Sequence, residues 1–349
     1  MGSAQGFEPA LWARISQEMC WCATAIPESL GGLGLGRVEL VLILEQMGRR
    51  QTCAPFFSTV ALAATALSEF GSVSAQNRWL PKIAQNSSRV TLALSAHGVQ
   101  FDEKSPGASA ARLDDGWQLE GSFSHVPDGD SAELILIVAK IVHEEEDEAF
   151  GLFAVPKGSQ GMSTTPLISW DTTRRLAKVE LSGLQLQAAD RIDTGTHSKL
   201  ALARIEALAA LLLSAEQLGG AQQCLDLSLA HTAQRVQFGQ PIAAFQAVKH
   251  RCAEMMVRIE ATRSIVYGAA ALSDTQTLKT ELLMQAGAAK AQASETFFFC
   301  AQEAVQLHGG VGFTWEYDPQ LYFKRAQASC NWLGTADQWR ERIASTLLD

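Results

Sequence analysis

The sequence lacks the residue patterns that mark several common protein classes. Its seven cysteines form no C-x-x-C pair and their number is odd, so neither a zinc site nor a disulfide framework is indicated. Free thiols are typical of a reducing compartment, and the sequence therefore predicts a cytoplasmic protein without a metal site. No uninterrupted apolar run approaches about 18 residues, which predicts that the chain does not cross a membrane.

Positive charge is also scarce. The chain has 28 lysines and arginines against 37 aspartates and glutamates, and its formal net charge is -9. Proteins that bind nucleic acid usually present a basic face, so a nucleic-acid partner is not expected. The motifs of two hydrolase classes are missing, since there is neither a G-x-S-x-G elbow nor an H-E-x-x-H pair. A glycine-rich segment at residues 32–36 follows no strand, so it does not indicate a dinucleotide-binding loop.

The hydrophobic pattern changes character twice along the 349 residues. Helical spacing predicts four helices in the first part, at residues 11–20, 37–49, 56–70 and 76–84. Short β-branched and apolar runs then predict strands at residues 90–94, 117–120, 134–139, 151–155 and 177–181. Long periodic segments predict helices again at residues 200–231, 241–273, 276–308 and 336–348. We therefore expect an α+β protein with an N-terminal helical domain (1–88), a middle β domain (89–195) and a C-terminal four-helix bundle (196–349).

Two motifs in the C-terminal part are more specific than these patterns. The first places an isolated cation, an aromatic ring and an amide near a turn between two helices: Arg235, Phe238 and Gln246. The second is Gln306-Leu307-His308-Gly309-Gly310-Val311-Gly312-Phe313, which interrupts a long helix with glycines. Both motifs could simply be helix ends with packing residues. Adjacent glycines also allow a ligand to approach the backbone closely.

The two motifs, their order and the helix–β–helix arrangement resemble the acyl-CoA dehydrogenase family over almost the whole chain. The resemblance implies the fold of that family and FAD as the cofactor. In the family, motifs of this kind reach the FAD held by a neighbouring subunit, with the arginine at the pyrophosphate, where a guanidinium can form bidentate hydrogen bonds. The implied cofactor-binding residues are Arg235, Phe238, Gln246, Gln306, Gly309, Gly310 and Thr335.

The sequence departs from the family where the catalytic base belongs. Family members often read Glu-Gly-Thr near the C-terminus, and here this position is Leu333; the other place used for the carboxylate aligns with Ala209. Leucine and alanine cannot accept the α-proton of a thioester. Glu206, Glu216 and Asp337 are candidates for a relocated base, with Glu206 the first choice, although a capping or solvated role is more typical of each. We therefore predict no catalytic residue in this chain.

A second departure concerns the contacts to the flavin ring. The family usually shows an A-x-T-E-P loop and a Trp-x-Thr strand there, and this chain has residues 94–98 (Leu-Ser-Ala-His-Gly) and His125-Val126-Pro127. Pro127 stands at the threonine position. Proline offers neither a backbone N–H nor a hydroxyl, so the resemblance implies that the chain's own ring site is impaired.

The chain departs from the family at its own base and flavin-ring positions, but it keeps the motifs that reach a neighbour's FAD. This pattern resembles the non-catalytic subunit of heteromeric acyl-CoA dehydrogenases of bacterial steroid side-chain degradation. The resemblance implies a heterotetramer with a catalytic partner subunit that supplies the base, an acyl-CoA substrate converted to a trans-2-enoyl-CoA, and an electron-transfer flavoprotein as oxidant. One alternative is a self-sufficient homo-oligomeric dehydrogenase with a relocated carboxylate. Another is a non-enzymatic acyl-CoA-binding or scaffold protein.

Overall fold

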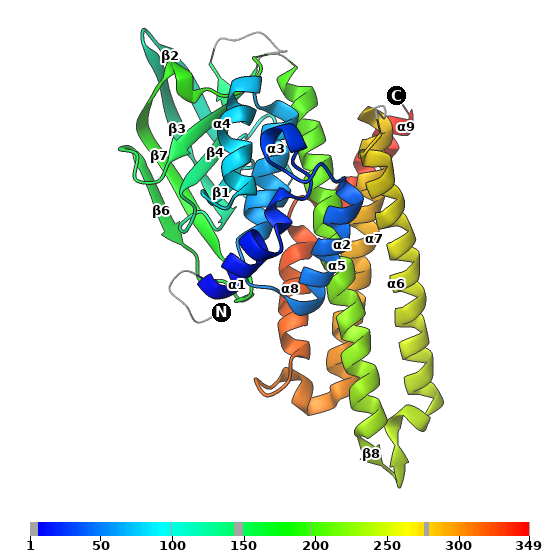
Figure 1. Ribbon diagram of the computed structural model, residues 1–349. Coiled ribbons are helices and arrows are strands. Elements are labelled where there is room, and N and C mark those ends of the chain that lie inside the picture. Colours follow the sequence, from blue (N-terminus) through cyan, green and yellow to red (C-terminus); the bar gives the residue numbers. More distant parts are fainter. Residues whose placement is uncertain (1–5, 99, 143–148, 196, 276–278, 349) are drawn as a thin grey trace. The chain divides into compact units, whose positions relative to one another are not determined.

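A computed structural model describes residues 6–98, 100–142, 149–195, 197–275 and 279–348 (Figure 1). The chain divides into two compact units. The first combines Met1–Glu39 with Cys53–Ala209, and the second combines Leu40–Thr52 with Ala210–Asp349. The domain boundaries expected near residues 88 and 195 stay a prediction.

The first unit opens with short helical segments. Their bounds are α1 (Pro9–Ala13), η1 (Arg14–Glu18), η2 (Trp21–Ala23), η3 (Glu28–Leu30), the start of α2 (Arg37–Arg50), η4 (Phe57–Ala64), α3 (Thr65–Phe70) and α4 (Val73–Ala84). All residues of η4 are buried, and Ser72 caps α4 by accepting a hydrogen bond from the backbone N–H of Ala75 at 3.3 Å. Helical segments cover most of each of the four helices expected here: α1 with η1, α2, η4 with α3, and α4. Pro81 lies inside α4.

This unit also contains a seven-stranded sheet (Figure 1), the short helix η6 (Ala188–Asp190) and the first residues of α5 (Ser198–Gln234). The strands are β1 (Val90–Ala93), β2 (Ala108–Leu113), β3 (Gly116–Pro127), β4 (Leu134–Ile141), β5 (Phe150–Pro156), β6 (Met162–Pro166) and β7 (Leu176–Gln187). They follow the order β1-β4-β2-β3-β7-β6, and β5 pairs with β4. Phe123, Ile137, Phe153 and Val179 are fully buried in its hydrophobic core. The sequence did not predict β2 or β6, because their outward residues are exposed and few of their side chains are large and apolar.

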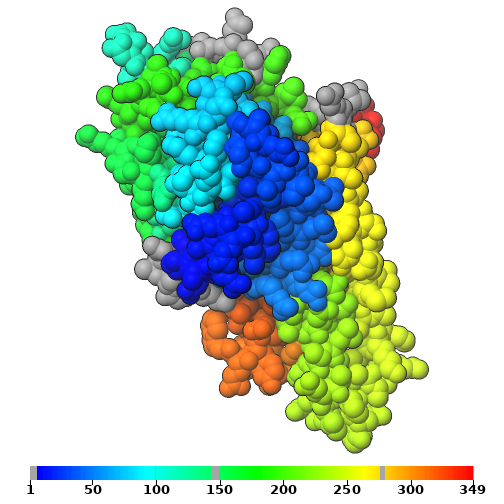
Figure 2. All heavy atoms as spheres, in the orientation of Figure 1, coloured from blue at the N-terminus to red at the C-terminus, as the bar shows by residue number. Residues whose placement is uncertain are grey.

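The second unit is helical apart from one small hairpin. After α5 (Ser198–Gln234) come β8 (Val236–Gln237), β9 (Gln240–Pro241), η7 (Ile242–Ala244), α6 (Gln246–Ser273), α7 (Lys279–His308), η8 (Gly309–Phe313), α8 (Pro319–Asn331) and α9 (Ala336–Leu348). The hairpin is an exposed tip at the ends of α5 and α6 (Figures 1 and 2). Helix α8 was not predicted, and the first residues of the helix expected at 276–308 lie outside the described residues.

Glycines allow two helices of the second unit to pack backbone against backbone. A Cβ atom on Gly219 of α5 would lie 1.8 Å from the carbonyl oxygen of Glu45 on α2, and one on Gly48 would lie 2.0 Å from that of Glu216. No side chain fits at these distances. Bulkier residues at either glycine would therefore force α2 and α5 apart.

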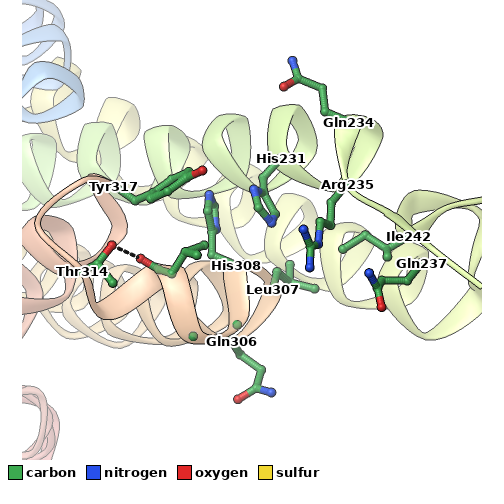
Figure 3. Close-up of a pocket in the computed structure, with 13 residues that line it drawn as sticks. His231, Gln234, Arg235, Gln237, Ile242, Gln306, Leu307, His308, Thr314 and Tyr317 are labelled. Carbon is green, nitrogen blue, oxygen red and sulfur yellow. Dashed lines mark hydrogen bonds between the residues drawn. The ribbon is translucent and has the colours of Figure 1, made fainter.

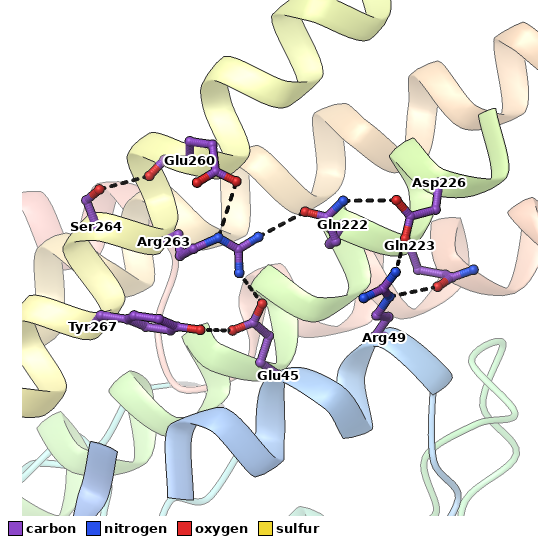
Figure 4. A network of polar contacts seen from close by, with 9 residues as sticks. All are labelled: Glu45, Arg49, Gln222, Gln223, Asp226, Glu260, Arg263, Ser264 and Tyr267. Carbon is purple, nitrogen blue, oxygen red and sulfur yellow. Dashed lines mark hydrogen bonds and ion pairs between the residues drawn. The ribbon is translucent and has the colours of Figure 1, made fainter. Parts of the chain in front are cut away.

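A polar network joins α2, α5 and α6 beside this contact (Figure 4). Glu45 accepts hydrogen bonds from Arg263 and, at 2.5 Å, from the hydroxyl of Tyr267. Arg263 also donates to Gln222 at 2.9 Å. Glu45 is buried, so its charge depends on these partners.

Candidate functional site

A pocket of about 660 Å³ lies within the second unit, where the ends of α5 and α7 meet (Figure 3). Its wall combines residues from the end of α5, from β8 and η7, from the end of α7, from η8 and from the segment that follows η8. Four of the seven cofactor-binding residues implied by the sequence line it together: Arg235, Gln306, Gly309 and Gly310.

Arg235 follows the last residue of α5 directly. Its backbone N–H donates to the carbonyl of His231 at 2.9 Å, and its carbonyl accepts from Ile242 at 2.8 Å across the β8–β9 hairpin. The main chain of Arg235 is therefore fixed. Within the described ranges, no carboxylate lies at ion-pair distance from its guanidinium, which faces the pocket (Figure 3). An arginine without an internal counterion is suited to hold an anion.

The glycines at the end of α7 leave the backbone uncovered. Gly309 has φ = 66°, a left-handed conformation that glycine adopts at helix ends without strain. A Cβ atom on Gly309 or Gly310 would meet no heavy atom within 4 Å. Packing therefore does not demand a glycine at 310, whereas close approach of a ligand to the main chain would.

Two histidines that sequence reasoning did not select lie between these groups. The rings of His231 and His308 are stacked, with centroids 4.2 Å apart and planes at 23°. The ring of Tyr317 meets both edge-on, at 6.2 Å and 6.1 Å. Their positions offered a signal, because His231 precedes Arg235 by four residues on one helix and His308 adjoins Gly309.

Burial lowers the pKa of both histidines. For His231 the second cause is the positive charge of Arg235. For His308, a hydrogen bond between Nδ1 and the carbonyl of Ala304 at 2.7 Å raises the pKa in part, and His231 lowers it further. The neutral form of the pair is therefore favoured in the free chain near pH 7.

The other three implied cofactor residues lie outside the pocket wall. Phe238 is 91% exposed on the hairpin turn and meets Phe245 edge-on at 6.1 Å. Gln246 begins α6 and is exposed. Thr335 caps α9, since its hydroxyl accepts from the N–H of Gln338 at 3.2 Å and its own N–H donates to that side chain at 2.9 Å.

The turn at the expected base position is tightly held. Leu333 is only 4% exposed with φ = 57°, and its carbonyl accepts from the indole N–H of Trp339 at 2.8 Å. The ammonium of Lys290, which is fully buried, donates to Gly334 O at 3.1 Å and to the hydroxyl of Ser294 at 2.8 Å. Burial lowers the pKa of Lys290 to about 7. No acid side chain stands at this turn.

The candidate relocated carboxylates all have structural partners. Glu206 is 2% exposed and accepts a hydrogen bond from the backbone N–H of Phe101 at 2.7 Å. Glu216 pairs with Arg325 at 2.6 Å, with both side chains nearly buried. Asp337 is exposed and lies 3.3 Å from Arg340. Each contact is a typical structural role for a carboxylate.

The end of β3, expected to face a flavin ring, is closed by internal contacts. Pro127 is buried, and its carbonyl accepts from the hydroxyl of Thr91 at 2.6 Å. The N–H of Ser124 donates to Ala96 O at 2.8 Å. A Cβ atom on Gly98 would lie 2.5 Å from the Cβ of His125, so residues 94–98 pack directly on the strand.

The family model described as "Acyl-CoA dehydrogenase, C-terminal domain" matches residues 198–348, and "Acyl-CoA dehydrogenase, N-terminal domain" matches residues 2–87. The acyl-CoA dehydrogenase IpdE2 of Mycolicibacterium smegmatis is 30% identical over 98% of this chain and 89% of that protein.

Two solved structures are similar throughout. One is the ChsE4–ChsE5 complex from Mycobacterium tuberculosis, with a TM-score of 0.88 and 27% identity over 100% of this chain and 90% of that chain. The other is a variant of the Tcur3481–Tcur3483 steroid ACAD, with a TM-score of 0.86 and 27% identity over 99% and 90%. Across the part of the chain that the structure describes, no helix has the length and apolar character needed to span a membrane.

Proposed function

The chain belongs to the acyl-CoA dehydrogenase family, and we propose that it acts there as the base-lacking partner of a complete subunit. In this role it contributes to the α,β-dehydrogenation of an acyl-CoA thioester by completing an FAD site on the neighbouring subunit. The observation that carries the proposal is a contrast. The guanidinium of Arg235 faces a pocket and has no ion-pair partner among the described residues, whereas the turn at Leu333 carries no acid.

The pocket fits the diphosphate half of FAD. Arg235 can form two parallel hydrogen bonds to phosphate oxygens, and the uncovered backbone of Gly309 and Gly310 admits a ligand that any side chain would obstruct. Gln306 is exposed on the same wall and offers an amide donor and acceptor. The exposed Phe238 and Gln246 extend this surface around the hairpin.

The same chain does not fit the flavin ring at its own β3 end. Pro127 has no N–H to donate, and its carbonyl is engaged by Thr91. Ala96 O, on the facing loop, is engaged by Ser124. We therefore derive no step at this position, and we assign the ring and the reacting carbons to the partner subunit.

The division of chemistry follows from the residues. FAD, when bound, accepts the hydride that leaves the β-carbon of the substrate. Removal of the α-proton requires a positioned base, which Leu333 cannot be. Glu206 holds the Phe101 amide and Glu216 holds Arg325, so neither is free to replace it. In the proposal the partner supplies the carboxylate, and an electron-transfer flavoprotein reoxidises the cofactor.

Two of the similar structures support a heteromeric assembly and a steroid-type substrate. One is named as the ChsE4–ChsE5 complex, and the other as the Tcur3481–Tcur3483 steroid ACAD. We extend both features to this chain as part of the proposal. The acyl group is then expected to be a bulky steroid side-chain thioester.

The decisive experiment is cofactor stoichiometry. The chain is purified alone and after co-expression with the acyl-CoA dehydrogenase encoded next to it, and FAD is quantified by absorbance after denaturation. We expect no stable FAD in the chain alone and one FAD per two chains in the assembly. Full occupancy of a homomer would support the self-sufficient enzyme instead, and an assembly without any FAD would support the scaffold.

A further inference from the structure

The His231–His308 stack has no task in the family motif described above, yet it forms the inner wall of the pocket. Both rings lie beside Arg235, on the side of the pocket toward Tyr317 (Figure 3). His308 is almost buried, and the ring of His231 covers it. A stacked imidazole pair placed beside an unpaired guanidinium is an unusual arrangement, because it gathers three basic groups in one place.

The tautomer of His308 follows from its hydrogen bond. A carbonyl oxygen can only accept, so Nδ1 of His308 must carry the proton in its contact with Ala304 O at 2.7 Å. The other nitrogen, Nε2, then has a lone pair when the ring is neutral. Protonation of His308 would therefore occur at Nε2, without disturbing the bond to the helix.

The charges that face the pair all have the same sign. Among the described residues that line the pocket, the titratable or charged side chains are His231 from α5, Arg235 directly after it, His308 from α7, and Tyr317. No carboxylate belongs to this lining. Burial lowers the pKa of both histidines in the free chain, and the positive charge of Arg235 lowers that of His231 further.

A diphosphate diester changes this balance, because it brings two fixed negative charges to Arg235. Its field opposes that of the guanidinium and favours the protonated imidazole. We propose that His231 and His308 join Arg235 as the anion-binding groups of this pocket, and that the pair takes up one proton from solvent when the FAD diphosphate binds. This inference rests on the function proposed above and adds two binding residues and a pH dependence to it.

The stack sets the number of protons. Two imidazolium rings 4.2 Å apart would repel each other strongly, so the pair is expected to titrate as a unit that holds one proton. Thermodynamic linkage then gives the direction in which FAD affinity changes with pH. Since the bound state holds the extra proton, FAD binds more tightly as the pH falls through the range where the free pair is neutral and the bound pair is charged.

The test measures FAD binding to the apo-assembly of this chain with its partner, at pH 6 and pH 8. We expect binding to be about tenfold tighter at pH 6, which by linkage corresponds to an average uptake of about half a proton between the two pH values. The double variant His231→Phe/His308→Phe keeps two stacked aromatic rings and removes the ionisable nitrogens, so its affinity should be nearly equal at the two pH values. His250→Phe is the matched control, because His250 is exposed on α6 and does not line the pocket.

Titration calorimetry in two buffers of different ionisation enthalpy gives a second measurement on the unmodified assembly. Uptake of about half a proton per FAD is expected between pH 6 and pH 8, the average that a tenfold change in affinity over two pH units requires. Zero uptake, or an identical pH dependence in the wild type and the double phenylalanine variant, overturns the inference while leaving the proposed function intact. An assembly that binds no FAD at any pH overturns the proposed function itself.

Discussion

Two places in the second unit were both expected to serve the cofactor and the substrate, and they differ in how their polar groups are used. At the Arg235 pocket, the guanidinium and the amide of Gln306 have no partner among the described residues, and two glycines leave the backbone uncovered. At the Leu333 turn, Lys290 and Trp339 satisfy the carbonyls from within. The polar groups of the Arg235 pocket are therefore available to a ligand, whereas those of the Leu333 turn already form hydrogen bonds within the chain.

The β3 end of the first unit resembles the turn rather than the pocket. Pro127 O accepts from Thr91, Ala96 O accepts from Ser124, and the Phe101 amide donates to Glu206. Hydrogen-bonding groups that a ligand would need are thus already engaged. In the proposed role neither region takes part in catalysis. The predictions below test whether polar groups with internal partners and polar groups without them respond differently to mutation.

The largest effect on stability is expected from Lys290→Met. The change removes the donor to Gly334 O, Ser294 Oγ and, at 3.3 Å, the carbonyl of Ser329, and it leaves these buried acceptors with fewer partners. We expect the free energy of unfolding in urea to fall by about 3 kcal/mol. Lys249→Met, at an exposed position on α6, removes the same charge and should change it by less than about 0.5 kcal/mol.

The difference in unfolding free energy between the wild type and Lys290→Met should increase as the pH rises. Burial lowers the pKa of Lys290 from its ordinary value of 10.5 to about 7, so between these values the unfolded chain holds a proton that the folded chain has released. Wild-type stability therefore gains with rising pH in this range, and the gain is absent in Lys290→Met. A difference between the two proteins that is larger at pH 6 than at pH 9 would contradict this account.

Among changes in the Arg235 pocket, Arg235→Met should weaken FAD binding the most. Loss of a bidentate, charge-assisted contact costs about 2–3 kcal/mol, which corresponds to roughly 30- to 150-fold weaker FAD binding by the assembly. The stability of the chain should be nearly unchanged, because no internal partner of the guanidinium is lost. Lys249→Met again serves as the charge control, and equal weakening by both variants would mean that only net charge matters.

The sequence predicted most of the fold and part of the site, for identifiable reasons. Long periodic helices such as α5 and α7 and apolar strands such as β4 carry strong patterns, and the comparisons confirm the fold class. Strand β6 is missed because four of its five residues are Ser, Thr or Pro. Helix α8 is missed because it follows a glycine-rich segment and its apolar positions are sparse.

The histidine pair shows why part of the site escaped sequence reasoning. Arg235 and Gln306 belong to motifs that can be matched as strings, and the structure places both on one pocket wall. His231 and His308 are 77 positions apart, and only packing of α5 against α7 stacks their rings. Likewise, nothing in the local sequence indicates that the carboxylate of Glu206 holds the Phe101 amide. Contacts between distant segments have no local signature.

Leu333→Glu would sharpen the comparison by placing an acid where the family usually has one. The side chain is 4% exposed and the surrounding donors are already engaged, so we expect a loss of about 2 kcal/mol in unfolding free energy. The chain purified alone should still show no acyl-CoA dehydrogenase activity, because Pro127 remains. Leu333→Gln is the matched control for polarity without a base. Turnover by the Glu variant alone would show that the base was the only part missing.

Glu206→Gln should have the smallest effect, because the amide oxygen can still accept the hydrogen bond from the Phe101 N–H. We expect a loss of at most about 1 kcal/mol in stability and an unchanged rate of turnover by the assembly. Glu206→Ala removes the acceptor altogether and leaves the partly buried Phe101 N–H with one partner fewer, so it should cost about 2 kcal/mol in the same unfolding measurement. Together the two variants distinguish a structural role of Glu206, as a hydrogen-bond acceptor, from a role as the catalytic base. If the glutamine variant folds normally but abolishes turnover, Glu206 is the base after all. The end of β3 and the Phe101–Glu206 contact would then belong to an active site.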